Sequence, residues 1–205
     1  MELKRVVVTG LGAITPVGNN VPEMWNNIVN GVSGAAPITH FDTEKFKTKF
    51  ACEVKGFNAA DYIDPKEARK MDLYSQYAIA AAKQAMADSK MDLEKVNLDR
   101  IGVIYGVGIG GLRTFEEEYG YYERTKENGP KFNPFFIPKM ISDISVGHIS
   151  IMFGLRGPNF VTTSACASST NALIDAFNYI RLGKADAIIA GGAEAAITVG
   201  GVGGF

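Results

Sequence analysis

Cysteine, histidine and tryptophan are scarce in this sequence, whose 205 residues include two cysteines, two histidines and one tryptophan. Two cysteines exclude a miniprotein held together by disulfides and are typical of a reducing compartment. No apolar run approaches the ~18 residues of a membrane span, and the first residues do not resemble a signal peptide. We therefore expect a cytoplasmic protein that does not enter a membrane.

An excess of charge of one sign is also missing, because 21 Lys and Arg residues face 22 Asp and Glu residues, for a net charge of -1. This balance gives no overall field that would recruit nucleic acid or anionic lipid, although a local basic patch is compatible with it. The hydrophobic share of 46% and the charged share of 21% are close to those of average globular chains. This composition excludes a disordered or collagen-like chain.

Short apolar runs that favour buried strands alternate along the chain with segments that favour helices. We expect strands at residues 5–10, 50–54, 100–105, 159–165 and 185–190. We expect helices at residues 22–30, 65–89 (with a break near residues 71–72), 138–153 and 168–182. Irregular structure with a short helix is expected at residues 113–134, and a glycine-rich loop at residues 199–205. The alternation predicts an α/β fold with a mainly parallel sheet that helices cover on both faces.

Cys166 stands where one expected strand meets the helix expected from residue 168. Its sulfur would lie beside the first N–H groups of that helix, where the helix dipole favours an anion and thiols ionise readily. Small neighbours leave space for a substrate, and the N–H group of Cys166 would face a developing oxyanion. A buried structural cysteine is the alternative, and both interpretations stay open at this point. Cys52 has no such surroundings, so we expect it to be structural.

A nucleophilic cysteine normally works with a histidine, and the sequence offers His40 and His148. We expect His40 in a loop and His148 inside an apolar helix, both as structural residues. The catalytic machinery predicted around Cys166 is therefore incomplete within these residues.

Four sequence motifs give the chain a family resemblance. Residues 162–170, which include Cys166, resemble the active-site segment of the β-ketoacyl-acyl carrier protein synthases, the condensing enzymes of fatty-acid synthesis. Residues 147–158 are similar to the segment that precedes the nucleophile in that family, and residues 190–194 to the motif that follows it. Residues 6–18 resemble the opening of the family's sequences.

The resemblance implies a thiolase-like fold, which consists of two similar halves, each with a five-stranded, mainly parallel sheet and helices on both faces. Residues 1–205 would be the N-terminal half, and the C-terminal half would be absent from this chain. That second half should carry two catalytic histidines, a lysine and a glycine-rich loop. Their absence accounts for the missing partner of Cys166 and leads us to expect that this chain is inactive alone.

The resemblance also implies an acyl pocket. Residues 106–111 resemble the elongating synthase II type, in which Ile109 would gate this pocket. Phe205 would line it. Three further side chains would reach into the pocket of the second copy in a homodimer: Phe136, Ile137 and Ile141.

A basic patch is expected at residues 66–70, because Lys66, Arg69 and Lys70 follow one another at the spacing of one helix face. Such a patch is ordinarily a solvated surface. The resemblance implies that it docks an acidic acyl carrier protein, with Lys131 as a further basic contact.

The reaction implied is a decarboxylating Claisen condensation. The Cys166 thiolate would attack the thioester of an acyl chain on the phosphopantetheine arm of acyl carrier protein. Malonyl-carrier protein would then lose carbon dioxide and attack the acyl-enzyme, giving a lengthened 3-oxoacyl chain. Neither a redox cofactor nor a metal ion is expected.

Two other functions compete with this one. The chain could be a catalytically silent half that only binds a carrier protein. It could also be a nicotinamide-dependent reductase, because a strand followed by Gly10 and Gly12 resembles a dinucleotide-binding turn. The third glycine comes too late for that motif, and Pro16 stands where the helix should begin.

Overall fold

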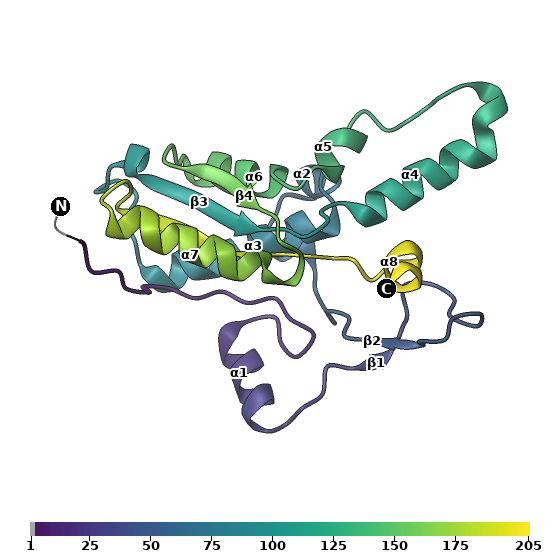
Figure 1. Ribbon diagram of the computed structural model, residues 1–205, viewed down its shortest axis with the longest axis horizontal. Coiled ribbons are helices and arrows are strands. Elements are labelled where there is room, and N and C mark those ends of the chain that lie inside the picture. The colour runs from purple at the N-terminus through teal and green to yellow at the C-terminus, as the bar shows by residue number, and fades with distance from the viewer. Residues whose placement is uncertain (1–2) are drawn as a thin grey trace.

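The computed structural model describes residues 3–205, in which a parallel sheet lies between helices and a smaller lobe lies beside it (Figure 1). The parallel sheet has the order β4-β3-β5, with strands at Asn159–Thr162 (β4), Ile101–Gly106 (β3) and Ala187–Gly192 (β5). The lobe holds a two-stranded antiparallel sheet of Ala36–Pro37 (β1) and Phe50–Ala51 (β2).

Most of the helices lie around the parallel sheet, and α1 lies in the lobe (Figure 1). The α-helices span Val21–Val29 (α1), Pro65–Ala68 (α2), Leu73–Ser89 (α3), Leu112–Thr125 (α4), Phe136–Met140 (α5), Ile144–Phe153 (α6), Ser168–Arg181 (α7) and Val199–Gly204 (α8). Short 3-10 helices span Ala59–Asp61 (η1), Leu98–Arg100 (η2), Lys126–Asn128 (η3) and Ala165–Ala167 (η4). Within residues 3–205, no helix combines the length and the apolar character that a membrane crossing needs.

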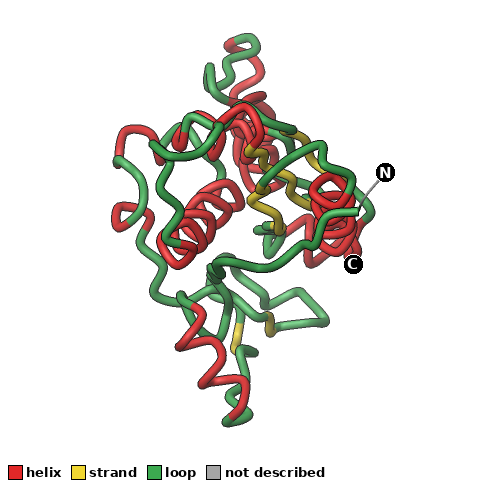
Figure 2. Tube along the Cα trace, turned by 90° about the vertical axis from the view of Figure 1, so that its left-hand side faces the viewer, coloured by secondary structure: helices red, strands yellow, loops and turns green. Residues whose placement is uncertain are grey.

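The core has two sides because successive side chains of the central strand β3 point to opposite faces of the sheet. Val103 and Tyr105 pack with Ile79 of α3 and Ile149 of α6. Ile104, which is fully buried, packs against α7 on the other face. Figure 2 shows the strands between these two helical layers. The expected α/β class, with a parallel sheet covered on both faces, is confirmed.

The helices α2 and α3 begin where the sequence signals predict. The side chain of Asp64 accepts a hydrogen bond from the N–H group of Lys66 and caps α2, which has Pro65 as its first residue. The expected break occurs where Asp72 caps α3. Asp72 is buried and also accepts from the N–H and hydroxyl groups of Thr114, so it ties the start of α3 to α4.

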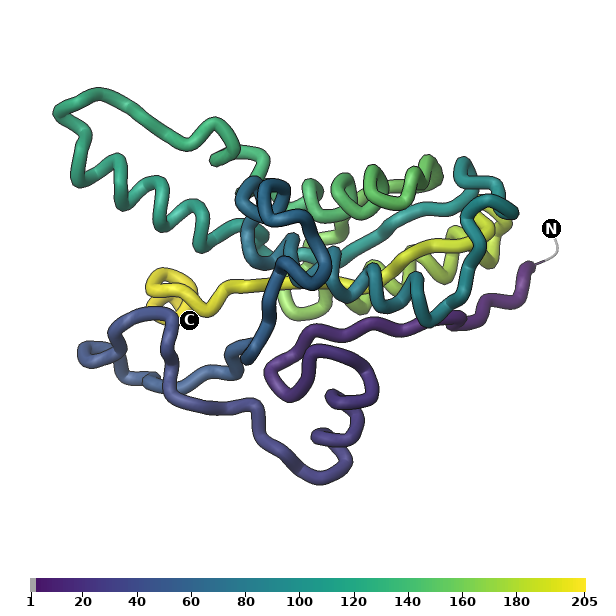
Figure 3. The backbone as a smooth tube through the Cα atoms, turned by 180° about the vertical axis from the view of Figure 1, so that it is seen from behind, coloured from purple at the N-terminus to yellow at the C-terminus, as the bar shows by residue number. Residues whose placement is uncertain are grey.

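The strand expected at residues 5–10 is wrong. This segment is extended but does not join the parallel sheet, which has three strands where five were expected, and Val7 and Val8 are exposed. Both sides of β3 are occupied, by β4 and by β5. Residues 10–13 lie along α3 instead, where the N–H group of Leu11 donates to Asp88 (2.9 Å). The purple chain can be followed along this path in Figure 3.

The expectation for residues 113–134 is wrong as well, because most of the segment forms the long helix α4. Contacts one helical turn apart stabilise it. The rings of Phe115 and Tyr119 stack with centroids 5.8 Å apart, and Arg113 pairs with Glu117 at 2.9 Å. These contacts are local. Aromatic residues are enriched in strands, however, so the composition of this segment does not predict the helix.

The glycine-rich tail forms a helix, α8, where a loop was expected. Glycine is a poor helix former, so its first turn needs other support. The Thr198 side chain accepts from the N–H group of Gly201 and caps the helix. Glu116 of α4 accepts from the Thr198 hydroxyl (2.6 Å) and from the N–H group of Gly200 (2.8 Å).

Gly106 allows α7 to approach the end of the sheet, and its replacement tests this packing. A Cβ atom at this position would overlap the backbone of Ser168 and Ser169. We expect Gly106→Ala to lower the free energy of unfolding by ~1–3 kcal/mol, as overpacking does. Chemical denaturation measures this loss.

Gly147→Ala is the matched control, because nothing lies within 4 Å of a Cβ atom there and the residue is inside α6. Alanine favours helix over glycine, so this variant should be equally or more stable, by up to about 1 kcal/mol. Equal stability of the two variants would contradict the packing argument.

Candidate active site

The candidate site is built around Cys166 in the short turn between β4 and α7. Its side chain is exposed. Ala165, which precedes it, has a φ angle of +51°. This left-handed conformation is costly for a residue with a side chain and is found where the surrounding structure enforces it. The chain therefore turns sharply here and presents the cysteine outward at the start of α7.

Hydrogen bonds within the turn hold this conformation. The buried hydroxyl of Ser168 donates to the carbonyl of Ala165 (2.7 Å) and accepts from the N–H group of Ser164 (2.9 Å). The amide of Asn171 donates to the Ser164 hydroxyl at 2.6 Å. In the sequence Ser168 is notable only as a small neighbour of Cys166. Its role depends on the conformation of Ala165, which no sequence pattern revealed.

The start of α7 also lies close to the ends of the neighbouring strands. Gly106 and Gly192 are paired in the register of β3 and β5, so both strands end beside α7. A Cβ atom at Gly192 would overlap the Ser169 side chain. No side-chain hydrogen bond from the described residues caps α7. The positive end of its dipole therefore faces the turn that carries Cys166.

The loop after β3 carries Ile109 and lies beside this turn. The carboxylate of Glu194 accepts from the N–H groups of Gly108 (2.9 Å), Ile109 (2.8 Å) and Gly110 (3.3 Å). On its other side, the Thr163 hydroxyl donates to the carbonyl of Val107 at 2.9 Å. Neither Glu194 nor Thr163 is predicted from the sequence as a site residue. The signals for Glu194 are its place in the motif at residues 190–194 and its position just after an expected strand end.

A cavity of about 730 Å³ opens beside the Ile109 loop. Side chains from three regions line it, among them Ile109, Phe115, Ile141 and Phe160. Thr163, three positions before Cys166 in the chain, also lines it. The structure thus brings Ile109, the expected gate, to the same apolar cavity as Ile141, which was expected to reach into the pocket of a second copy.

The other predicted acyl-pocket residues are spread more widely. Phe136 of α5 stacks on Phe132 and Phe115, and Phe115 reaches the cavity wall. Ile137 of α5 is 53% exposed. Phe205 is fully exposed at the end of the chain, and it lines a second cavity.

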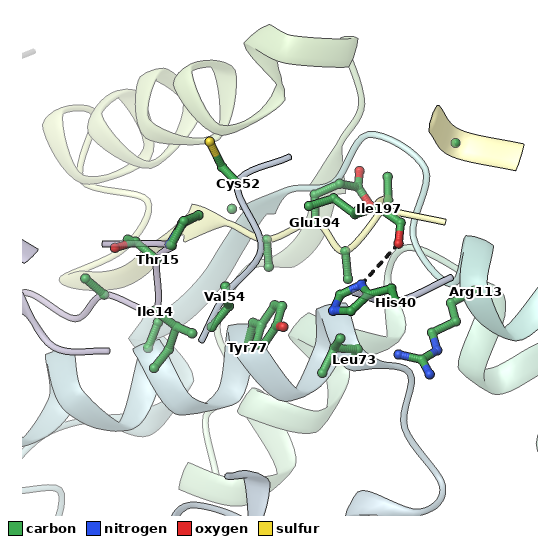
Figure 4. Close-up of a pocket in the computed structure, with 18 of the residues that line it drawn as sticks. Ile14, Thr15, His40, Cys52, Val54, Leu73, Tyr77, Arg113, Glu194 and Ile197 are labelled. Atoms are coloured by element: carbon green, nitrogen blue, oxygen red, sulfur yellow. Dashed lines mark hydrogen bonds between the residues drawn. The ribbon is translucent and has the colours of Figure 1, made fainter. Parts of the chain in front are cut away.

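That second cavity has a volume of about 910 Å³ and lies between the lobe and the main sheet (Figure 4). Cys52, His40 and Glu194 line it. Tyr77 forms part of the wall, and burial raises its pKa to about 12, so its hydroxyl stays neutral. Arg113 also lines it, and the hydrogen bond to Glu117 raises the Arg113 pKa further, so this side chain keeps its charge.

Neither histidine forms a hydrogen bond with Cys166 among the described residues. His40 lies in a loop, with Nδ1 3.2 Å from the carbonyl oxygen of Ile197. His148 lies in α6, where burial lowers its pKa against a smaller opposing effect of Glu67. Residues 3–205 also bring together no group of three or more His, Cys, Asp and Glu side chains that would hold a metal ion.

The predicted basic patch lies around α2, which is shorter than expected. Lys66 is inside α2, Arg69 caps its C-terminus, and both are exposed. Lys70 follows, with Nζ 2.7 Å from Glu67 and 5.8 Å from the centroid of the Phe135 ring. Lys131 is exposed in the loop between η3 and α5.

Comparison with known sequences identifies a family. The family model described as the N-terminal domain of beta-ketoacyl synthase matches residues 3–205. The chain is 46% identical over 203 residues to 3-oxoacyl-[acyl-carrier-protein] synthase 2 of Staphylococcus aureus (strain COL), covering 98% of this chain and 48% of that protein. It is 44% identical to the Synechocystis protein of the same name, covering 97% of this chain and 47% of that one. The chain therefore spans about half the length of the curated relatives it matches.

Solved structures show the same fold. The ishigamide ketosynthase/chain length factor superposes with a TM-score of 0.89 at 26% identity, over 99% of this chain and 50% of that one. A beta-ketoacyl synthase from Burkholderia phymatum gives a TM-score of 0.74 at 27% identity, over 89% and 45%. A type II polyketide ketosynthase, solved in complex with its acyl carrier protein, gives a TM-score of 0.80 at 24% identity, over 96% and 53%.

Alkylation of the two cysteines tests the geometry of the turn. We expect iodoacetamide to modify Cys166 about two- to fivefold faster than Cys52, because the start of a helix stabilises a nearby anion by ~0.3–1 kcal/mol. Both side chains are exposed, so Cys52 serves as a reference within the same molecule. In Ser168→Ala the rate at Cys166 should fall toward that of Cys52.

Ser168→Ala should also lower the free energy of unfolding by ~1–3 kcal/mol, because it leaves the hydrogen-bond partners of the Ser168 hydroxyl unsatisfied. Mass spectrometry of peptides gives both alkylation rates, and denaturation gives the stability. An unchanged rate ratio in Ser168→Ala would show that the serine does not position the cysteine.

Proposed function

The chain belongs to the β-ketoacyl synthase family, and we propose that the complete protein is a 3-oxoacyl-acyl carrier protein synthase of the elongating type II. The observation that carries this proposal is the exposed Cys166 in a strained turn at the start of α7. The 46% identity to a synthase 2 over 98% of the chain supports the assignment to that type.

Cys166 is the proposed nucleophile. Its thiolate attacks the carbonyl carbon of an acyl thioester, and the bond to the carrier's sulfur breaks as the new sulfur–carbon bond forms. The carrier thiolate leaves and takes up a proton. Cysteine suits this exchange because its sulfur is a good nucleophile and a good leaving group. The dipole of α7 favours the negative charge on the sulfur before the attack.

The second step needs groups that residues 3–205 do not place near Cys166. We assign them to a second half of the protein, as the resemblance implies: two histidines, a lysine and a glycine-rich loop. There malonyl-carrier protein loses carbon dioxide, and the resulting enolate attacks the acyl-enzyme. The products are the lengthened 3-oxoacyl chain on the carrier and the free Cys166. This scheme includes no redox cofactor and no metal ion.

Ile109 is the proposed gate of the acyl pocket. It is 43% exposed and lines the cavity of about 730 Å³ beside the cysteine turn. We further propose that Phe136, Ile137 and Ile141 complete the pocket in a homodimer and that Phe205 lines it in the complete protein. The 53% exposure of Ile137 is compatible with a contact to a second copy.

The partner we propose is an acidic acyl carrier protein, docked on the patch around α2. Lys66 and Arg69 are exposed there without a salt bridge among the described residues. A solved ketosynthase of the same fold is in complex with its acyl carrier protein. Two cysteines without a disulfide agree with a cytoplasmic location.

The two competing functions have less support. The dinucleotide-binding interpretation needs a strand at residues 5–10, which is not part of the sheet. Gly10 and Gly12 pack against the backbone of α3, so they are not available to a pyrophosphate. A silent carrier-binding module stays a candidate for this half taken alone, and the Cys166 experiment below separates it from an enzyme.

Replacement of Cys166 tests the enzymatic proposal. In the complete protein, Cys166→Ser should abolish the acyl adduct and lower the condensation rate by about 10⁴-fold or more, because the nucleophile is lost. Intact-mass spectrometry after incubation with acyl-carrier protein measures the adduct. The midpoint of thermal unfolding should stay unchanged, since the residue is exposed. An acyl adduct on another residue would contradict the assignment of Cys166 as the nucleophile. A wild-type protein that binds the carrier but forms no adduct and no condensation product would favour the silent carrier-binding module.

Charge reversal tests the docking patch. The double variant Lys66→Glu, Arg69→Glu should weaken binding of acyl carrier protein by about tenfold at low salt, because like charges then face the partner. The difference should shrink as salt screens the charges. Lys95→Glu is the control, since Lys95 is exposed away from the patch and pairs with Asp92. Equal effects of the patch and control variants in fluorescence titrations would argue against docking at α2.

A further inference from the structure

Among residues 3–205, only the carboxylate of Glu194 accepts hydrogen bonds from three successive backbone N–H groups. The donors are Gly108, Ile109 and Gly110, at 2.9, 2.8 and 3.3 Å. Hydrogen bonds to a charged acceptor are roughly twice as strong as neutral ones. The three contacts span 84 to 86 positions in sequence, so they join two distant parts of the chain at one point.

The loop and the carboxylate are complementary in shape. Gly110 has a φ angle of +86°, a conformation that suits glycine, and a Cβ atom there would lie 2.8 Å from the carbonyl oxygen of Met140. A Cβ atom at Gly108 would lie 2.8 Å from Glu194 Oε2. A side chain at Gly108 would therefore push the carboxylate away. The contact with Glu194 therefore explains the glycine at position 108, and the left-handed backbone beside Met140 explains the glycine at position 110.

Glu194 itself is held by the end of the sheet. It follows β5, and the N–H group of the adjacent Ala193 donates to the carbonyl of Gly106 in β3 (3.2 Å). Val107 directly precedes the loop at residues 108–110, and its carbonyl accepts a hydrogen bond from the hydroxyl of Thr163. Thr163 lies in the segment that leads to Cys166. The backbone of Ile109 is thereby fixed relative to both the sheet and the cysteine turn, while its side chain lines the apolar cavity.

We propose that Glu194 is a positioning residue that sets acyl-chain selectivity by fixing the backbone of Ile109 at the mouth of the acyl pocket. This inference rests on the proposed function. Ile109 can admit a longer chain only by moving, and movement of its backbone breaks hydrogen bonds to Glu194. Loss of the carboxylate therefore lowers the barrier against long acyl chains, and Glu194 acts through Ile109 without touching the substrate.

The test uses the complete protein as wild type, Glu194→Ala and Glu194→Gln. The first readout is the ratio of kcat/KM for palmitoyl- to octanoyl-carrier protein. We expect Glu194→Ala to raise this ratio by about tenfold, which corresponds to the loss of one charge-assisted hydrogen bond. Glutamine keeps one acceptor oxygen and the size of the side chain, so its effect should be smaller. Ile109→Gly, which removes the gate itself, gives the upper limit.

The second readout is hydrogen exchange at residues 108–110, which does not depend on activity. Their amide protons should exchange faster in Glu194→Ala than in the wild type, with Glu194→Gln between the two. Glu23→Gln is the matched control, because Glu23 is also an exposed carboxylate that accepts a backbone N–H group, that of Asn19 at 2.9 Å in the lobe. It should change neither readout.

Each outcome decides one point. Unchanged exchange at residues 108–110 would overturn the positioning role. Faster exchange with an unchanged palmitoyl to octanoyl ratio would overturn the link to selectivity. A wild-type protein without condensing activity would overturn the proposed function and, with it, the selectivity role. If Glu194→Ala does not fold, Glu194→Gln decides the same questions.

Discussion

The close approach of α7 to the end of the parallel sheet is the constraint on which the rest of the structure depends. Helix and sheet can come this near only because Gly106 has no side chain where the backbone of Ser168 and Ser169 passes. Gly192, its partner in β5, leaves room for Ser169 in the same way. The chain between β4 and α7 is thereby short and sharply turned. The exposure of Cys166 and the φ angle of Ala165 follow from this packing.

Carboxylates that accept backbone N–H groups hold the segments around this turn. Asp72 accepts from Thr114 at the start of α4, Glu116 of α4 from Gly200 at the start of α8, and Glu194 from the Ile109 loop. Each contact joins segments that are distant in sequence. Polar groups thus position the loops around the cavities, while the apolar core positions the strands and helices beneath them.

The proposed function follows from the same arrangement. One half of a condensing enzyme needs to supply a nucleophile, a pocket for the acyl chain and a surface for the carrier. The residues proposed for these roles come from the turn at Cys166, the loop at Ile109 and the patch around Lys66. Cys166 and Ile109 lie on segments that connect regular elements, as functional residues commonly do, whereas Lys66 lies inside the short helix α2. The remaining acid–base groups would have to come from outside residues 3–205.

Local sequence patterns predicted much of the architecture. The break at Asp72, the end of α6 at Gly154 and the strand-to-helix turn at Cys166 all follow from signals a few residues long. Such signals indicate which secondary structure a segment favours, but they do not specify which other segments it pairs with or packs against. Residues 5–10 have the composition of a buried strand, yet they do not join the parallel sheet. The glycines of α8 favour a loop, yet Thr198 and Glu116 support a helix there.

The sequence by itself determined the α/β class, the family and the position of the proposed nucleophile, because each depends on contiguous residues. Only the tertiary structure decided which strands share the sheet, how Ser168 shapes the cysteine turn and that Glu194 holds the loop of Ile109. These features depend on groups that meet across 56 to 86 positions, or on a single dihedral angle. Neither leaves a pattern in the order of the amino acids, because the backbone N–H group that donates is the same in every residue except proline.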